Sequence, residues 1–156
     1  MYETFDHTAD LGLRVRAADA AELFTDAARG LFSAMLANPD AVNPVEEIAI
    51  HLEGNNLEEL WHDWLSELLY VFHGRRMALV EFHVDLNLPA TGAAPSENVD
   101  AETRVSPPMI LNATARGEPI DPSRHQIEME VKAVTWHQLK VEQSPEGWLG
   151  EVILDI

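Results

Sequence analysis

Residues 57–73 read LEELWHDWLSELLYVFH, and any fold for this chain has to bury this stretch. Asn56 just before it and Glu59 within it form a capping pattern, and Gly74 follows its end. Its large apolar residues recur at helical spacing as one wide stripe, formed by Leu57, Leu60, Trp61, Trp64, Leu65, Leu68, Leu69 and Phe72. The pattern predicts a helix over 57–73 whose stripe belongs to a protein core.

A second amphipathic helix is predicted over residues 20–37. Asp19 is its candidate N-cap, with Glu22 three residues later. Pro39 disfavours helical geometry in the residue before it and therefore ends the helix. The apolar residues again follow helical spacing: Leu23, Phe24, Ala27, Ala28, Leu31, Phe32, Met35 and Leu36.

Alternating apolar and polar residues predict strands around these helices. The expected strands cover residues 11–16, 48–53, 80–88 and 109–117, followed by a hairpin of 134–141 and 148–155 with its turn at 144–147. In the last strand Leu154 and Ile156 share one face, and Asp155 points to the other. Asp155 is therefore expected in a different environment from its neighbours.

Residues 89–108 carry Pro89, Gly92, Pro95, Pro107 and Pro108 among small and polar residues. This composition predicts a long flexible loop. The chain of 156 residues fits one domain, and neither flank of the loop holds a core of its own. The loop is therefore interpreted as an insertion within a single domain, residues 1–156.

The composition restricts the classes of function. The formal net charge is −17, and so acidic a surface repels phosphate backbones and disfavours autonomous binding of nucleic acid. It suits a partner with a basic face, or a metal ion. The absence of cysteine excludes disulfides, thiolate zinc sites and cysteine nucleophiles. No membrane-length apolar run and no signal-peptide pattern is visible, so we expect a cytoplasmic protein without membrane contact.

The two ends of the chain carry the most suggestive polar residues. Residues 6–10 read DHTAD, and the chain ends with Asp155 and Ile156. The Asp155 side chain, the following main-chain carbonyl and the terminal carboxylate of Ile156 bring three oxygen donors close together. With Asp10 beside them, they would suit a divalent cation such as Ca²⁺ or Mg²⁺. The alternative is a last strand that simply ends in a solvated carboxylate.

No self-contained catalytic motif is visible. The chain lacks a His-Glu-x-x-His motif, a Gly-rich phosphate loop and a Gly-x-Ser-x-Gly elbow. His62 on the long helix is interpreted as a surface residue. His7, between Asp6 and Asp10, could be a ligand, an acid–base group or a packed residue, and spacing does not choose among these.

Several short stretches, taken together, resemble the archease family, the small partner proteins of the RNA-splicing ligase. They are collinear and span nearly the whole chain: residues 6–12, 65–70, 117–118, 121, 124–125, 130–137, 147–148 and 155–156. Each is short, and their shared order makes the resemblance specific. The 89–108 loop is longer than is usual in the family, a departure that bears on local partner contacts and not on membership.

The resemblance implies an α+β fold, a single compact domain with two main helices packed on a mixed β-sheet. It implies an accessory protein, not an enzyme, that activates the RNA-splicing (tRNA) ligase by promoting its guanylylation and multiple turnover in tRNA splicing and RNA repair. It also implies a metal site at Asp10, Asp155 and Ile156, of the Ca²⁺ type, with Mg²⁺ or Mn²⁺ as alternatives. Further candidates for functional or partner contacts are Asp6, His7, Lys132 and His137.

Two other functions stay open at this point. One is a metal-dependent hydrolase that uses Asp6, His7 and Asp10. The other is a chaperone-like binding module with an apolar surface. Lys132 is one of only two lysines, and its simplest role would be a neutralising salt bridge.

Overall fold

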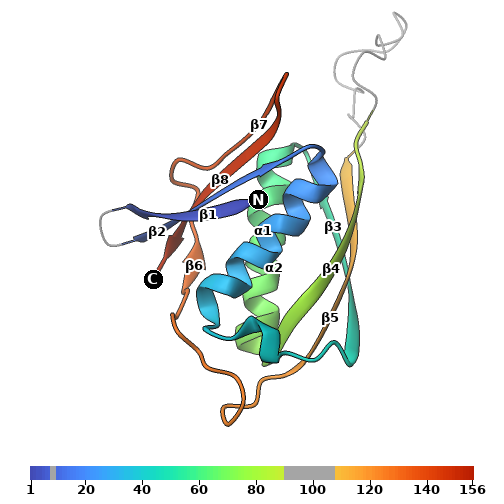
Figure 1. Ribbon diagram of the computed structural model, residues 1–156. Coiled ribbons are helices and arrows are strands. Elements are labelled where there is room, and N and C mark those ends of the chain that lie inside the picture. The colour runs from blue at the N-terminus through green and yellow to red at the C-terminus, as the bar shows by residue number, and fades with distance from the viewer. Residues whose placement is uncertain (8–9, 90–107) are drawn as a thin grey trace, which may run out of the picture.

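The computed structural model describes residues 1–7, 10–89 and 108–156 (Figure 1). The insertion predicted at 89–108 therefore lies, apart from its two end residues, outside the described residues. In chain order the elements are β1 (Tyr2–His7), β2 (Asp10–Ala17), α1 (Ala20–Met35), η1 (Pro39–Ala41), β3 (Glu46–Gly54), α2 (Leu57–Gly74), β4 (Met77–Asn87), β5 (Met109–Pro119), β6 (Ala133–Val134), β7 (Lys140–Ser144) and β8 (Gly147–Asp155).

The two main helices pack between two sheets (Figure 1). The larger sheet has the order β1-β2-β8-β6, with β7 also paired to β8, and the smaller has the order β3-β5-β4. Helix α1 contacts β2 and β4, and α2 contacts β3 and β6, so each helix touches both sheets. This confirms a compact α+β domain built on two main helices.

The sheets differ in one respect from the single mixed sheet that the resemblance implied. All strand pairs within the described residues are antiparallel, and they divide into two sheets. The pairs β1–β2, β4–β5 and β7–β8 are each consecutive in the chain, and strands joined directly in this way pair antiparallel.

Both helices begin where the sequence predicts. The Asp19 and Asn56 side chains each accept a hydrogen bond of 2.8 Å from the backbone N–H three residues later, and so cap α1 and α2. Helix α1 ends at Met35, two residues earlier than expected. The reason is that Leu36 leaves the helix to form an isolated β-bridge with Ile127.

The predicted apolar stripe of α2 forms the centre of the core. Trp61 and Trp64 are fully buried, and the Trp64 indole N–H donates to the Phe24 carbonyl at 2.9 Å. The Trp61 ring lies over Gly150 of β8, where an added Cβ would come within 2.5 Å of the ring. Glycine at 150 therefore lets α2 pack closely on β8, the strand that ends at Asp155.

Strand β1 was not predicted. Residues 2–7 pair with β2 from Tyr2–Val15 to His7–Asp10 and form an edge of the larger sheet. An edge strand exposes residues on both faces, so its sequence does not alternate cleanly. On its outer face the Phe5 ring covers Gly12.

The prediction of one continuous strand over 134–141 is wrong. Val134 pairs with Leu154 and Lys140 pairs with Glu151. The chain therefore advances six residues between these two pairs, while β8 advances only three. The three surplus residues leave the sheet as a turn, in which Gln138 has a left-handed φ of 54°. The predicted turn at 144–147 is confirmed by the Ser144–Gly147 pair.

Candidate functional site: the strand-end edge

The candidate site lies at one end of the strands of the larger sheet. There the end of β1 is followed across the sheet by the start of β2, the end of β8 and β6 (Figure 1). The register pairs the His7 and Asp10 positions, and it pairs Asp155 with Ala133. Leu11 pairs with Leu154, so one further step of this register puts Asp10 beside Asp155. We call Asp10, Asp155 and Ile156 the strand-end edge; it unites residues from both ends of the sequence.

The two carboxylates of the strand-end edge share the outer face of the sheet. Leu11 and Leu154 are buried in the core, and successive residues of a strand point to opposite faces. Asp155 is exposed, which confirms that it projects away from the Leu154 side, and Asp10 is half-buried. The partly buried Ile156 packs against the core, and this packing fixes the position of the chain end.

The segment 132–137 is fastened to the last strand by its main chain. The Lys132 N–H donates to the Asp155 carbonyl at 2.7 Å. The N–H and hydroxyl of Thr135 both donate to the Ile153 carbonyl, at 3.1 and 2.9 Å. The exposed His137 follows, with its N–H 3.3 Å from the Thr135 hydroxyl. Lys132 is thus adjacent to the strand-end edge, whereas His137 lies in the turn between the part of the chain bonded to β8 through Thr135 and strand β7.

Two imidazoles of α2 hold this segment from the other side. His73 Nε2 lies 2.8 Å from the Val131 carbonyl, and His62 Nε2 lies 3.1 Å from the Val134 carbonyl. Since a carbonyl only accepts, both Nε2 atoms donate. The indole of Trp136 stacks on the His62 ring, with centroids 3.9 Å apart. His62 is therefore half-buried, and its interpretation as a surface residue is corrected.

The register separates Asp6 from Asp10. Asp6 pairs with Leu11, so it belongs to the opposite face of the sheet from Asp10, and it is exposed there. The His7 position lies opposite Asp10, but its side chain is outside what the structure describes. The fold thus does not gather Asp6, His7 and Asp10 on one face, as a hydrolase built on them would need.

The strand-end edge carries oxygen donors of the kind that bind hard divalent cations. Within residues 1–7, 10–89 and 108–156, no three His, Asp or Glu side chains gather closely enough to hold a metal ion. The register nevertheless places the Asp10 and Asp155 positions side by side, and the carboxylate of Ile156 follows directly after Asp155; all three carboxylates are anionic oxygen donors. Such donors suit a hard divalent cation, and the exposure of Asp155 leaves room for water or a partner's ligands. The residues present fit such an ion.

A second polar group, which we call the Glu118 cluster, consists of Glu118, Asp121, Arg124 and His125. Glu118 and His125 are buried, with 2.7 Å between Glu118 Oε1 and His125 Nε2. The Asp121 N–H donates to His125 Nδ1 at 2.9 Å. Arg124, at 2.9 Å, and the N–H of Asn43, at 3.1 Å, hold the pKa of Glu118 down to about 2. The cluster ties the loop after β5 to the chain before β3.

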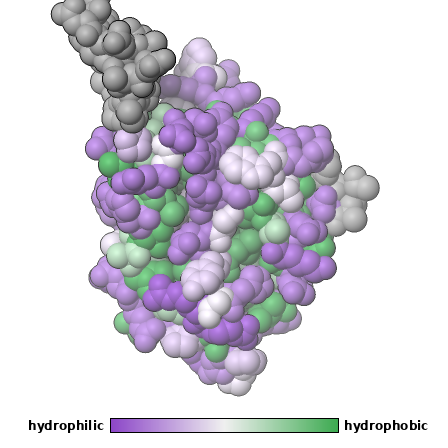
Figure 2. Space-filling model, turned by 180° about the vertical axis from the view of Figure 1, so that it is seen from behind, coloured by the Kyte–Doolittle hydropathy of each residue, from purple (hydrophilic) through white to green (hydrophobic). Residues whose placement is uncertain are grey.

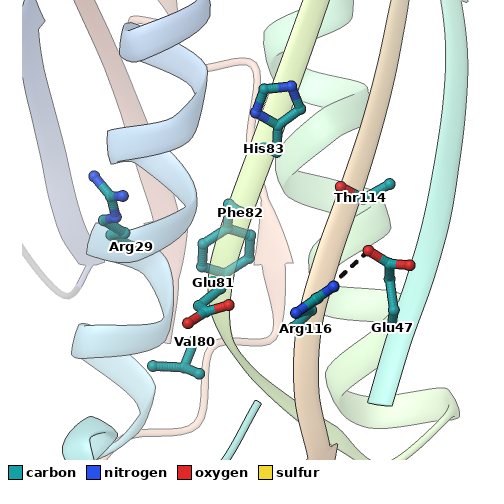
Figure 3. A pocket seen from close by; sticks show the side chains of 8 residues that line it. All are labelled: Arg29, Glu47, Val80, Glu81, Phe82, His83, Thr114 and Arg116. Carbon is teal, nitrogen blue, oxygen red and sulfur yellow. Dashed lines mark hydrogen bonds and ion pairs between the residues drawn. The ribbon is translucent and has the colours of Figure 1, made fainter. Parts of the chain in front are cut away.

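The outer face of the smaller sheet also carries charged residues, over a hollow of about 420 Å³. Figure 3 shows Arg116 and Glu47, which are 3.4 Å apart, directed at each other, while His83 and Arg29 point elsewhere. Outside this view, His83 pairs with Asp85 at 3.5 Å. These side chains do not converge on a common point, so the hollow has no arrangement for catalysis.

Along its whole length the chain resembles proteins of one family. Residues 2–156 match the archease protein family (MTH1598/TM1083). The sequence is 36% identical over 155 residues to the protein archease of Methanopyrus kandleri, covering 99% of each chain. It is 33% identical to the protein archease of Pyrococcus furiosus, over 99% of this chain and 98% of the relative.

Solved structures share the fold. The solution structure of Methanobacterium thermoautotrophicum protein 1598 matches with a TM-score of 0.75 and 27% identity, over 99% of this chain and 98% of that one. The crystal structure of a Thermotoga maritima protein, described as an archease and possible chaperone, matches with a TM-score of 0.56 and 16% identity, over 100% and 98%. At that identity the second likeness bears on the fold alone.

Proposed function

The chain belongs to the archease family, and on that basis we propose that it is an accessory protein that activates an RNA-splicing (tRNA) ligase. In this role it promotes guanylylation of the ligase and its repeated turnover, and catalyses no reaction itself. The observation that carries the proposal is the strand-end edge, where the fold brings Asp10 next to the end of the chain. A polar edge assembled from residues so far apart in the sequence is a surface suited to contact with a partner.

The charge of the chain supports a protein partner and not an RNA ligand. A net charge of −17 repels phosphates, whereas an enzyme that handles RNA and GTP presents basic surfaces. Complementary charges accelerate the encounter of two proteins and orient it. The acidic accessory protein thus meets the ligase without competing for its RNA.

At the strand-end edge, Asp10, Asp155 and the carboxylate of Ile156 are the residues that would hold a divalent cation. Ca²⁺ is the first expectation, and Mg²⁺ and Mn²⁺ take similar oxygen ligands. When bound, the ion supplies positive charge and open coordination positions to groups of the partner. The chain's own part is orientation: the Lys132 N–H holds the Asp155 carbonyl, and Ile156 packs on the core.

The two other candidate functions make different demands. A hydrolase would have to turn over a substrate without any partner, and the separation of Asp6 from Asp10 across the sheet weighs against it. A chaperone-like module would have to suppress aggregation of unrelated proteins. The Thermotoga maritima relative is described as a possible chaperone, so this assay belongs beside the ligase assay.

The test uses a purified RNA-splicing ligase and measures its guanylylation with and without this protein. A C-terminal extension beyond Ile156 turns the carboxylate into a neutral amide and adds bulk at the edge. We expect it to weaken Ca²⁺ and Mn²⁺ affinity by about tenfold or more in calorimetry and to reduce stimulation. The matched control is Ile156→Val, which keeps the carboxylate and removes one methylene. Equal ion affinity and equal stimulation by the extended protein would exclude Ile156 from the site.

An N-terminal tag is not a neutral control for this test. The amino group of Met1 lies 2.7 Å from the Asp26 carboxylate and donates to the Arg16 carbonyl at 2.9 Å. A tag removes that charge and disturbs the start of β1. Expression without an N-terminal extension therefore isolates the effect of the C-terminus.

A further inference from the structure

A row of three residues on the outer face of the larger sheet lies directly beside the strand-end edge. Phe5 of β1 pairs with Gly12 of β2, and Gly12 pairs with Ile153 of β8. Gly12 stands two residues after Asp10 on β2 and therefore shares its face. Ile153 stands two residues before Asp155 on β8 and likewise shares its face. The row is thus next to the two carboxylates, at a spacing of roughly 7 Å along the strands.

Glycine at position 12 makes room for the Phe5 ring. An added Cβ at Gly12 would overlap the far edge of that ring. The backbone does not require glycine here, because Gly147 is the only glycine of the described chain with a positive φ. The requirement at Gly12 is one of space: the ring of Phe5 reaches from β1 across β2 toward β8.

The burial of Ile153 shows that the outer face is covered at this row. Ile153 is only 2% exposed. It nevertheless belongs to the opposite face of β8 from Val152 and Leu154, which lie in the core. A side chain on the outer face is buried only where other side chains lie over it. The Phe5 ring, which extends over Gly12 toward this position, is placed to cover it from one side.

Arg14 holds the ring from the side away from the strand-end edge. Its guanidinium carbon lies 4.7 Å from the centroid of the Phe5 ring, a cation–π contact. Glu151 accepts a hydrogen bond from Arg14 Nε at 2.6 Å, and Glu3 accepts one from Arg14 Nη1 at 3.2 Å. Because these carboxylates pair with Arg14 from the two neighbouring strands, they fix the guanidinium group over the ring.

Small apolar groups on a protein surface usually need no function. Figure 2 shows one face of the molecule, on which hydrophobic patches are interrupted by hydrophilic and neutral residues. Two facts give the group of Phe5 and Ile153 more weight than such a patch. Gly12 reserves the space for the ring, and the group borders the strand-end edge.

We propose that Phe5 is a positioning residue of the ion site: its ring forms an apolar wall beside Asp10 and Asp155, and Gly12 makes room for that wall. The inference rests on the function proposed above, because it takes the strand-end edge to bind a divalent cation. The wall keeps water from one side of the carboxylates, and it ties together the strands that carry them. Surroundings of this kind orient the ligands of an ion and control the access of solvent to it.

The experiment measures the Ca²⁺ and Mn²⁺ affinity of the protein alone by calorimetry, and its free energy of unfolding in urea. Phe5→Ala removes the ring and Gly12→Ala displaces it, so each should weaken ion binding by about tenfold. The variant with both changes should bind no more weakly than Phe5→Ala, because the change at Gly12 then has no ring to displace.

Tyr2→Ala is the matched control. Tyr2 is an aromatic residue of the same strand, but it pairs with the buried Val15 and so belongs to the core side of the sheet. Its hydroxyl donates to the Ser33 hydroxyl of α1. The control should lower the free energy of unfolding and leave ion affinity unchanged. Equal weakening of ion binding by Tyr2→Ala would assign the effect to a general loosening of β1 and overturn the inference.

The other outcomes separate this inference from the proposed function. If the wild-type protein binds neither ion, the ion site fails and the inference fails with it, whether or not the ligase is stimulated. If the wild type binds and Phe5→Ala binds equally well, only the inference is overturned; this comparison holds even if Gly12→Ala does not fold. A double variant that loses as much affinity as the two single variants combined would show independent effects and likewise overturn it.

Discussion

In the Glu118 cluster, a buried carboxylate is surrounded by donors: Glu118 accepts hydrogen bonds from the exposed Arg124, from the N–H of Asn43 and from the buried His125. At the strand-end edge, by contrast, Asp155 is exposed and Asp10 half-buried, at the ends of two neighbouring strands. Both groups lie in stretches that carry the family resemblance.

The difference shows that polar residues of one fold can serve two different ends. A buried carboxylate is tolerated only where hydrogen bonds and opposite charge replace water, so the Glu118 cluster is a device for stability. The exposed carboxylate of Asp155, at the end of a strand, contributes little to stability and keeps its capacity for an ion or a partner. Substitutions at the edge should therefore change function alone, and substitutions in the cluster should change stability alone.

The largest effect is expected from Asp10→Ala. We expect it to abolish stimulation of the ligase and to lower divalent-ion affinity, because it removes one of the two side-chain carboxylates of the edge. The free energy of unfolding should change by less than about 1 kcal/mol, since no apolar core contact is lost. Guanylylation, calorimetry with Ca²⁺ and urea unfolding measure the three quantities.

Asp6→Ala is the matched control for that variant. Asp6 carries the same charge and lies in β1, but on the other face of the sheet. It should leave ion affinity unchanged. If a folded Asp10→Ala protein still stimulates the ligase fully, Asp10 does not belong to the site.

Glu118→Gln should have the opposite profile. The pKa of Glu118 is held at about 2 in the folded protein, against 4.5 for the ordinary group, chiefly by Arg124. Because the folded-state pKa is the lower one, its contribution to stability is present above pH 4.5 and is lost as the pH falls toward 2. The variant should be less stable at pH 7 and take up about one proton fewer than the wild type when it unfolds in acid.

Thermal unfolding at several pH values measures this difference. Glu128→Gln, an exposed residue of the same loop, is the control and should behave as the wild type. Ligase stimulation by folded Glu118→Gln at pH 7 should be normal. A specific loss of stimulation at full stability would make Glu118 functional and erase the distinction between the two groups.

The parts of the fold that depend on local sequence could be predicted. The caps Asp19 and Asn56 and the stripe around Trp61 and Trp64 act within a few residues, so both helices were found close to their observed limits. Strand β1 was missed because an edge strand exposes both faces. The break after Val134 was missed because it depends on the register with β8, which local alternation does not contain.

The candidate site required knowledge beyond local patterns. Asp10 and Asp155 come together only through the pairing of β2 with β8, from opposite ends of the sequence. The grouping came from the chemistry of the terminus and the family resemblance. The roles of His62 and His73 went unrecognised, although their separation of eleven residues is about three helical turns and places them on one face of α2.

A smaller effect is expected from Lys132→Ala, which should reduce stimulation more than Lys140→Ala. Lys132 is exposed beside Asp155, whereas Lys140 lies in β7 and pairs with Glu151 in the register. Among the described residues no carboxylate lies within ion-pair distance of the Lys132 ammonium group, so a structural salt bridge does not account for it. We expect the half-saturating concentration to rise several-fold, comparable with the removal of one interface charge. Equal activity of the two variants would remove Lys132 from the contact surface.

The smallest effect is expected from deleting residues 91–106 and joining the ends with a short Gly/Ser connection. Strands β4 and β5 pair as far as Asn87 and Ile110, so the chain ends to be joined are already close together. Shortening a loop changes the entropy of its closure only logarithmically, by about 0.6 kcal/mol for each halving. Glu118 lies nine residues along β5 from Met109, roughly 30 Å away, so the Glu118 cluster should keep its acid dependence. Urea unfolding and guanylylation should therefore match the full-length chain to within about 1 kcal/mol and about twofold. A deletion variant that fails to fold would show that this segment packs on the core; one that folds but no longer stimulates the ligase would extend the functional surface beyond the strand-end edge.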